Sequence, residues 1–220
     1  MGCGCTKNLT KNGPVSEILQ KLEENYELIL KQCDSSLLES EKNKIIEERH
    51  AALEKVKDNP EEMMKVVKEY NGKELEKDNK IIENENEKMK LLYKLGLDLA
   101  AELKEKMIKE LEEKISKAPS MTVQVLKSQL NEMTGFSPQE FLQSDFGKPL
   151  REALEKKGLN KAYMDGYKTT LKAQRKERRL KERGEFNINV NEFPDEEVFD
   201  DDKEGETFIE KLMKGEIKVQ

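Results

Sequence analysis

A stretch of about 45 residues, from Lys73 to Lys117, most constrains what this chain can fold into, because it reads as one uninterrupted helix. At a rise of 1.5 Å per residue, such a helix is about 65 Å long. Its leucines recur mostly every four residues, which favours packing against several helices over a simple two-stranded coiled coil. We therefore expect an all-α protein, an elongated multi-helix bundle around one long central helix.

The long stretch divides into two parts of different character. Residues 77–88 are nearly all polar, so we expect them to stand in solvent. Residues 91–108 are apolar on most sides and are expected to be buried. The whole chain is 39% charged and 35% hydrophobic, with 5% aromatic residues and no Trp. Such a composition is typical of solvated helices and not of a sheet core.

Helix start and stop signals place the other elements. A first helix is expected from about Ser16 to Cys33. A second begins with Asp34 or Ser35 as N-cap and stops before Pro60. The short helix after Pro60 is predicted to end at Asn71-Gly72, a typical C-terminal stop.

Pro119 is expected to end the long helix, and a shorter helix is expected to follow it. The sequence Ser137-Pro138-Gln139-Glu140 predicts a capping box, Gly147 and Pro149 a bend, and Gly158 a further stop. A last long helix is predicted from about Asn160 to Arg183. Residues 185–193 alternate between polar and apolar, the one strand-like pattern in the chain.

The N-terminal sequence Met-Gly-Cys-Gly-Cys-Thr-Lys fits a dual lipidation signal. Once the initiator methionine is removed, Gly2 presents the α-amine for myristoylation, and Thr6 fits the pattern that the enzyme reads. Cys3 and Cys5 are the expected palmitoylation sites, because one myristoyl chain alone binds membranes only marginally. These residues resemble the N-termini of G-protein α subunits and other dually acylated proteins. The resemblance covers residues 1–7 and implies a location at a membrane, not a fold.

Two other interpretations of this N-terminus compete with lipidation. It could be a plain disordered tail, or its cysteines could bind a metal. The remaining Cys and His residues are Cys33 and His50 alone, which do not make four organised zinc ligands. We expect no metal and no cofactor. No apolar segment reaches the roughly 20 residues that span a bilayer, so membrane contact is expected through the acyl chains.

The motifs that suggest enzymes lack their context. Asp145-Phe146-Gly147 matches the magnesium-binding triplet of protein kinases, but no glycine-rich loop or His-Arg-Asp segment accompanies it. A phosphate-binding Gly-x-x-x-x-Gly-Lys is missing as well. We expect no enzyme and assign no catalytic residue. The acidic residues 200–205 resemble the start of a calcium loop, but Lys211 stands where a bidentate Glu belongs, so a solvated loop is favoured.

A charge contrast marks the C-terminal third. Residues 159–183 hold nine Lys/Arg against three acids, a balance of +6, whereas residues 184–210 hold eleven acids against one Lys, a balance of −10. Three readings stay open: a solvated helix with an acidic tail, contact with anionic lipid, or pairing of the tail with the helix. The candidate residues for binding anionic lipid or a partner are Lys168, Lys172, Arg175, Lys176, Arg178, Arg179, Lys181 and Arg183. Scarce aromatics and a net charge of −6 argue against a nucleic-acid partner.

These observations divide the chain into three regions: residues 1–14 as acylated anchor and spacer, 15–183 as helical body, and 184–220 as extended segment and flexible acidic tail. We expect a scaffold or adaptor on the cytosolic face of a membrane (plasma, ciliary or flagellar, or endomembrane), anchored by myristoyl and palmitoyl groups and recruiting a protein partner. The alternative is a membrane-anchored sensor that is switched by ions, phosphorylation or a partner.

Overall fold

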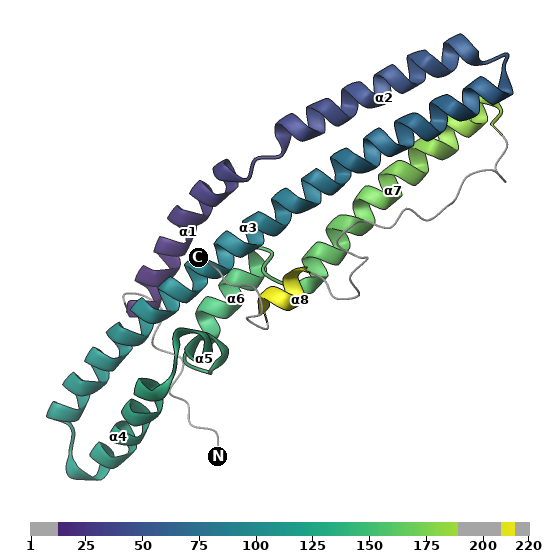
Figure 1. Ribbon diagram of the computed structural model, residues 1–220. Helices are drawn as coiled ribbons and strands as arrows, with labels where there is room; N and C mark the ends of the chain where they lie inside the picture. The colour runs from purple at the N-terminus through teal and green to yellow at the C-terminus, as the bar shows by residue number, and fades with distance from the viewer. Residues whose placement is uncertain (1–12, 189–207, 214–220) are drawn as a thin grey trace. The chain divides into compact units, whose positions relative to one another are not determined.

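The computed structural model describes residues 13–188 and 208–213, and every regular element in these two ranges is an α-helix (Figure 1). The predicted all-α fold with one long helix is confirmed. The helices, in chain order, are α1 (Pro14–Gln32), α2 (Ser36–Val56), α3 (Pro60–Lys117), α4 (Ser120–Gly135), α5 (Pro138–Gln143), α6 (Lys148–Lys156), α7 (Lys161–Phe186) and α8 (Phe208–Met213).

Helix α3 is longer than predicted. It runs for 58 residues without a break, so the expected stop at Asn71-Gly72 is wrong. A Cβ placed on Gly72 would meet no atom within 4 Å, and the residue has ordinary helical geometry. A glycine inside a helix costs only about 1 kcal/mol relative to alanine, which the packing of residues on either side outweighs. Val67 and Glu74, for example, are both buried.

The described helices belong to two compact units. Unit 1 contains α1, α3 from Met89 onwards, and α4, α5 and α6. Unit 2 contains α2, α3 up to Lys88, α7 and α8. The boundary therefore falls within the long helix itself, close to the change from polar to apolar residues that its sequence shows.

Unit 1 has an apolar core. Ile18 and Leu22 of α1 are fully buried, as are Leu92 and Leu103 of α3. Helix α1 contacts α6, and α5 contacts α6. The burial expected for the apolar part of α3 is observed in part, since Leu95, Leu97 and Met107 are only half-buried. Further core side chains come from α3, α4, α5 and α6, among them Met89, Leu99, Met133, Phe141, Leu142, Leu150 and Leu154.

The turns of unit 1 follow the local signals. The Ser137 hydroxyl accepts from the Glu140 amide at 3.2 Å, and the Glu140 carboxylate accepts from the Ser137 amide at 2.8 Å, which is the predicted capping box. At Gly147 a Cβ would lie 2.2 Å from the Phe141 carbonyl oxygen, so only glycine fits this bend. Gly158 has φ 100° and ends α6 where a stop was predicted.

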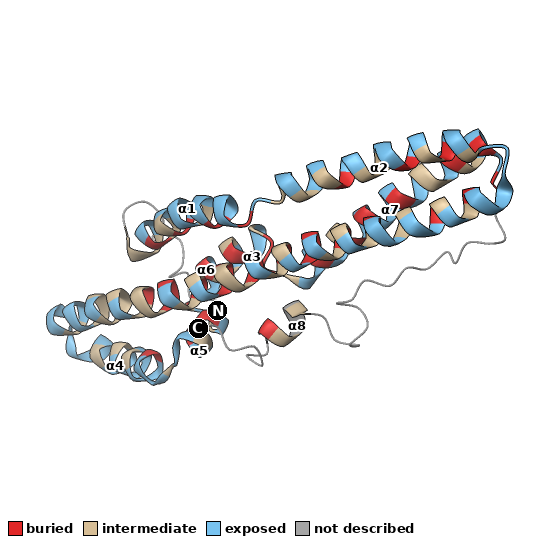
Figure 2. Ribbon diagram, turned by 45° about the horizontal axis from the view of Figure 1, so that its top comes forward, coloured by how far each residue is buried: buried red, intermediate tan, exposed pale blue. Residues whose placement is uncertain are grey.

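In unit 2, helices α2, α3 and α7 lie side by side (Figures 1 and 2). Asn160 caps α7 by accepting from the Tyr163 amide at 2.8 Å, as expected of an N-cap residue. The helix ends at Phe186, where Asn187 takes a left-handed conformation with φ 56°. Glu185 and Phe186 are therefore helical, so the strand predicted to start there is wrong at these two positions, while residues 189–193 lie outside the described ranges. Helix α8 contacts α7 and buries Leu212 completely.

Candidate functional site

Buried charges distinguish unit 2 from the rest of the described chain. All nine buried polar or charged residues found among the described ranges belong to it, and they come from α2, α3 and α7. Figure 2 shows buried stretches on these three helices. We call the set the charge seam; its members are Lys42, Arg49, Glu74, Asp78, Glu85, Lys88, Lys168, Arg175 and Glu182.

The centre of the charge seam is Asp78, which is fully buried. One carboxylate oxygen lies 2.5 Å from Lys42 Nζ of α2. The other oxygen lies 3.2 Å from Arg175 Nε of α7. A single α3 carboxylate thus joins a cation from each neighbouring helix, and removing it would take away the buried negative charge that both cations contact.

The same arrangement repeats one turn away at Glu74, which is 1% exposed. Arg49 Nη1 of α2 lies 3.6 Å from one of its oxygens, and Arg178 Nη2 of α7 contacts the other. Arg49 also reaches Glu182 Oε2 of α7 at 2.7 Å and donates to Asn71 Oδ1 at 2.7 Å. Burial lowers the pKa of Arg178 to about 10, although nearby Glu182 acts in the opposite direction.

At one end of the seam, Lys88 contacts the Glu85 carboxylate and donates to the Tyr163 hydroxyl at 3.1 Å. Burial tends to lower the pKa of Lys88, but the hydrogen bonds to Glu85 and Tyr163 outweigh it and the pKa is raised. The Tyr163 ring stacks on Tyr167 with centroids 6.3 Å apart. Burial, followed by the charge of Glu85, raises the pKa of Tyr167.

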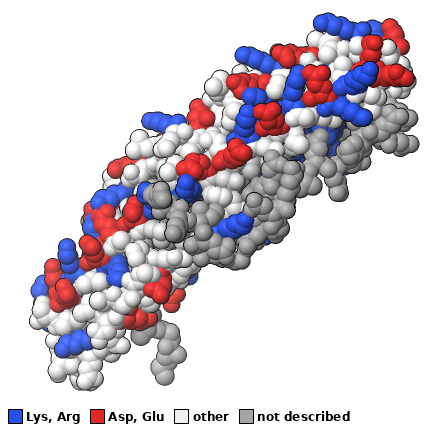
Figure 3. Space-filling view, in the orientation of Figure 1, with Lys and Arg blue, Asp and Glu red and all other residues white. Residues whose placement is uncertain are grey.

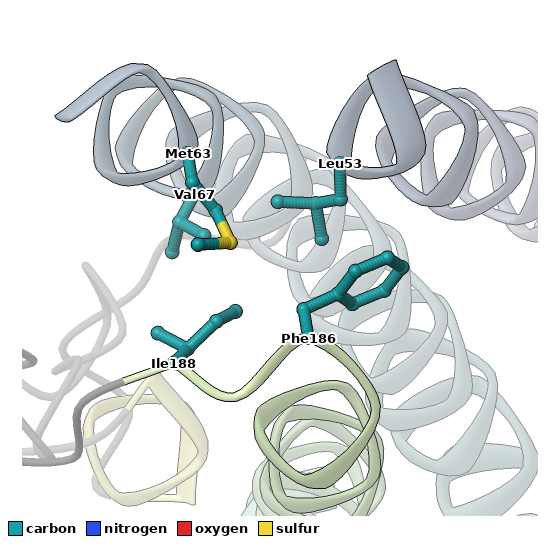
Figure 4. Packing of buried hydrophobic residues seen from close by; sticks show 5 residues of the cluster. All are labelled: Leu53, Met63, Val67, Phe186 and Ile188. Atoms are coloured by element: carbon teal, nitrogen blue, oxygen red, sulfur yellow. The ribbon is translucent and has the colours of Figure 1, made fainter. Parts of the chain in front are cut away.

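The other end of unit 2 is closed by an apolar cluster rather than by charge. Leu53 of α2, Met63 and Val67 of α3, and Phe186 and Ile188 at the end of α7 point toward one another (Figure 4). At its edge the His50 ring lies against Phe186 with centroids 5.3 Å apart, and His50 Nε2 lies 3.0 Å from Glu185 Oε1. The lone histidine is thus a partner of α7 at the rim of this cluster.

The charge seam follows helix periodicity. On α7 its buried members and their apolar neighbours recur every three or four residues, the spacing of a helix–helix contact: Met164, Lys168, Leu171, Arg175, Glu182 and Phe186, with the half-buried Arg178 between them. On α2, Lys42 and Arg49 stand seven residues apart. Charged side chains therefore occupy positions that apolar residues usually fill in such contacts.

The seam overturns one prediction. The polar residues 77–88 of α3 were expected to stand in solvent, yet Asp78, Glu85 and Lys88 are buried. Their charges are matched by cations, a carboxylate and a hydroxyl from within unit 2, so burial does not leave them without partners. On α7, charged residues recur at three- and four-residue spacing. This spacing is the sequence signal from which the seam could have been predicted.

The eight predicted cations of α7 do not share one environment. Arg175 is 3% and Lys168 4% exposed, and both belong to the charge seam. The exposed cations are Lys172, Lys176 and Lys181, and the half-buried ones are Arg178, Arg179 and Arg183. On the face shown in Figure 3, basic and acidic side chains are intermixed. The lipidation residues Gly2, Cys3 and Cys5, and the acidic residues 200–205, lie outside the described ranges.

Within residues 13–188 and 208–213, no group of three or more His, Cys, Asp or Glu side chains is placed to hold a metal ion. None of the helices in these ranges combines the length and apolar character needed to cross a bilayer. Comparisons with protein-family models, curated proteins and solved structures found no match to the chain.

Proposed function

We propose that this protein is a peripheral membrane scaffold, held on the cytosolic face of a membrane by acyl chains and recruiting a protein partner through its helical body. The observation that carries the proposal is the sequence of residues 2–7, in which Gly2 is an acceptor for myristate and Cys3 and Cys5 are acceptors for palmitate. Thr6 and Lys7 complete the pattern.

The anchor works because two kinds of lipid act together. A single myristoyl chain binds a bilayer with a constant of about 10⁴ M⁻¹, which permits rapid release. Each further buried methylene group adds about 0.8 kcal/mol, so one palmitoyl chain on Cys3 or Cys5 turns transient contact into stable residence. A thiol next to a myristoylated Gly2 is held at the surface where palmitoyl transfer takes place.

The helical body supports a scaffold for a physical reason. In unit 2, paired charges in the seam fix the register of α2 and α7 against α3. For partner contact, α4 presents Met121, 91% exposed, and Val125, 61% exposed. The surface around α4 is also mostly uncharged in Figure 3, unlike much of the rest.

The exposed cations of α7 supply a second membrane contact in this proposal. Lys172, Lys176 and Lys181 stand on the solvent side of the helix. Basic residues near an anionic surface contribute about 1 kcal/mol each, and this contribution is weakened by salt. The three lysines thus favour the cytosolic leaflet, where anionic lipids are enriched.

The proposal is tested by comparing wild type with Gly2→Ala and with Cys3→Ser/Cys5→Ser in cells. Gly2→Ala should move the protein to the soluble fraction, and the double serine variant should bind membranes weakly and reversibly. Mass spectrometry of the N-terminal peptide should show the acyl groups directly. An unmodified glycine with free thiols, or a Gly2→Ala protein that stays in the membrane fraction, would reject the anchor.

A further inference from the structure

In the charge seam, carboxylates of α3 contact basic side chains of α7. Phosphate groups at a membrane surface can form the same kind of contact. Asp78 and Glu74 present buried carboxylates to Arg175 and Arg178 of α7. A guanidinium group forms the same charge-assisted, often two-pronged contacts with carboxylate and with phosphate. The carboxylates of α3 therefore occupy the groups of α7 that phosphate headgroups of anionic lipids would bind.

Releasing α7 differs from releasing an apolar helix. A buried ion pair regains hydration on both sides when it separates, so its attraction is largely offset by the solvation that its charges recover. What opposes release is mainly the apolar contact of Met164, Leu171 and Phe186. At a bilayer these three side chains can be buried again in the interfacial region, as in membrane-surface helices.

We propose that α7 is an exchangeable helix: on a bilayer rich in anionic lipid it leaves α3 and binds the surface through its basic residues. The inference deepens the proposed function and rests on it, since an anchored chain keeps such a surface within reach. In the closed state, with α7 packed against α3, only the exposed lysines of α7 can bind lipid. In the open state, Lys168, Arg175 and Arg178 can bind lipid as well. This difference in binding is what allows lipid to shift the equilibrium between the two states.

The absence of Trp from the chain gives a clean reporter. Phe186→Trp places one Trp in the apolar cluster at the end of α7, where Phe186 is 7% exposed. The full chain is prepared without acylation as Gly2→Ala and mixed with vesicles of phosphatidylcholine brominated in its acyl chains, with or without phosphatidylserine. Exchange predicts strong quenching of Trp on the phosphatidylserine vesicles and none on phosphatidylcholine alone.

Asp78→Asn and Glu76→Gln form a matched pair for this test. Both lie on α3 and remove one negative charge, but Asp78 is in the seam whereas Glu76 is exposed and pairs with Lys80 at 2.7 Å. Asp78→Asn should bind phosphatidylserine vesicles about tenfold more tightly than Glu76→Gln and be quenched at a lower lipid concentration. Equal affinity and quenching of the two variants would overturn the exchange.

A second variant covers the case in which Asp78→Asn does not fold, which circular dichroism would reveal. The combination Lys42→Met, Asp78→Leu and Arg175→Met replaces the central ion pairs by apolar side chains of similar size, so α7 should stay closed. The Trp fluorescence of this triple variant should be quenched at least fivefold less than that of the reporter protein with the wild-type seam, compared at equal vesicle binding. Equal quenching of both would also overturn the exchange.

The remaining outcomes have defined meanings. If the reporter protein binds phosphatidylserine vesicles without quenching, α7 docks by its exposed face and the exchange is wrong. If it does not bind them, the exchange is wrong too. Because this protein carries no acyl group, either result leaves the lipid anchor standing. Conversely, an unmodified N-terminal peptide in cells rejects the anchor, whatever the vesicles show.

Discussion

Among the described residues, the buried side chains of unit 1 are apolar and its ion pairs lie at the rim, whereas unit 2 has ion pairs inside as well as at its surface. At the rim of unit 1, Lys21 Nζ of α1 lies 2.5 Å from the Glu102 carboxylate of α3, with side chains 40% and 33% exposed. Inside unit 2, Lys42 Nζ lies at the same distance from the Asp78 carboxylate, with side chains 9% and 0% exposed. A lysine ammonium group paired with a carboxylate is thus partly exposed to solvent in unit 1 and buried in unit 2.

The difference teaches what each kind of contact can do. Exposed ion pairs are screened and contribute 0–1 kcal/mol, so unit 1 is held by the transfer of apolar side chains from water. Buried ion pairs contribute little net stability, but a shift of one helix past another would leave charges unpaired. Unit 2 therefore obtains a defined register for α2, α3 and α7 from contacts that are weakly stabilising overall.

Asp78→Asn should break this comparison most strongly. The variant leaves the buried cations Lys42 and Arg175 facing a neutral amide, which should destabilise unit 2 by about 3–5 kcal/mol. Chemical denaturation followed by circular dichroism gives the total loss, and hydrogen exchange locates it in α2 and α7. Glu76→Gln is the control, and a change within about 0.5 kcal/mol is expected for it. Similar losses for both variants would contradict a buried seam.

Replacing Lys42, Asp78 and Arg175 together by apolar residues should not destabilise unit 2. In the Lys42→Met, Asp78→Leu, Arg175→Met variant both central ion pairs are removed together, and apolar side chains fill a similar volume. Substitutions of this kind range from neutral to about 1–4 kcal/mol stabilising. The denaturation midpoint of unit 2 should therefore stay or rise. A loss as large as that of Asp78→Asn would mean that the seam ion pairs stabilise unit 2 directly.

Two glycines on α3, one in each unit, compare the packing of the units. Gly72→Ala in unit 2 meets no neighbour within 4 Å and should stabilise by about 0.5–1 kcal/mol through helix propensity. In unit 1, a Cβ on Gly96 would lie 2.7 Å from Leu154 Cδ1, and Leu154 is 1% exposed. Gly96→Ala should destabilise by about 1 kcal/mol, because overpacking exceeds the gain in propensity. Opposite shifts in melting temperature are expected, and shifts of the same sign would refute this reading.

Local signals predicted the helices well. The breaks at Pro60 and Pro119, the capping box at Ser137 and the start of the last long helix near Asn160 are all observed, because each depends on residues within a few positions. The stop predicted at Asn71-Gly72 failed because a weak local preference was overridden by packing along α3.

The charge seam was not predicted because its logic is not local. Hydropathy treats Asp78 as a solvated residue, and only the partners on α2 and α7 make its burial tolerable. Those partners are 36 positions before it and 97 positions after it in the sequence. The basic character of α7 is evident from the sequence, but which cations point inward depends on the register of α7 against α3.

The smallest expected effect concerns acid and salt. The hydrogen bond from Lys106 lowers the pKa of Glu17, and hydrogen bonds from Lys21 and Lys106 lower that of Glu102, below the ordinary value of 4.5. A carboxylate with a lowered pKa in the folded state adds stability above its unfolded pKa, and this is lost as the pH falls through the folded value. Unit 1 should thus lose this small contribution below about pH 4.5, and Glu102→Gln should flatten that part of its pH profile.

At 1 M salt, where screening acts within about 3 Å, the contribution should vanish from unit 1 while the seam of unit 2 is little affected. Hydrogen exchange at low and high salt measures both units in one sample, and an equal response of the two would show that the seam is open to solvent.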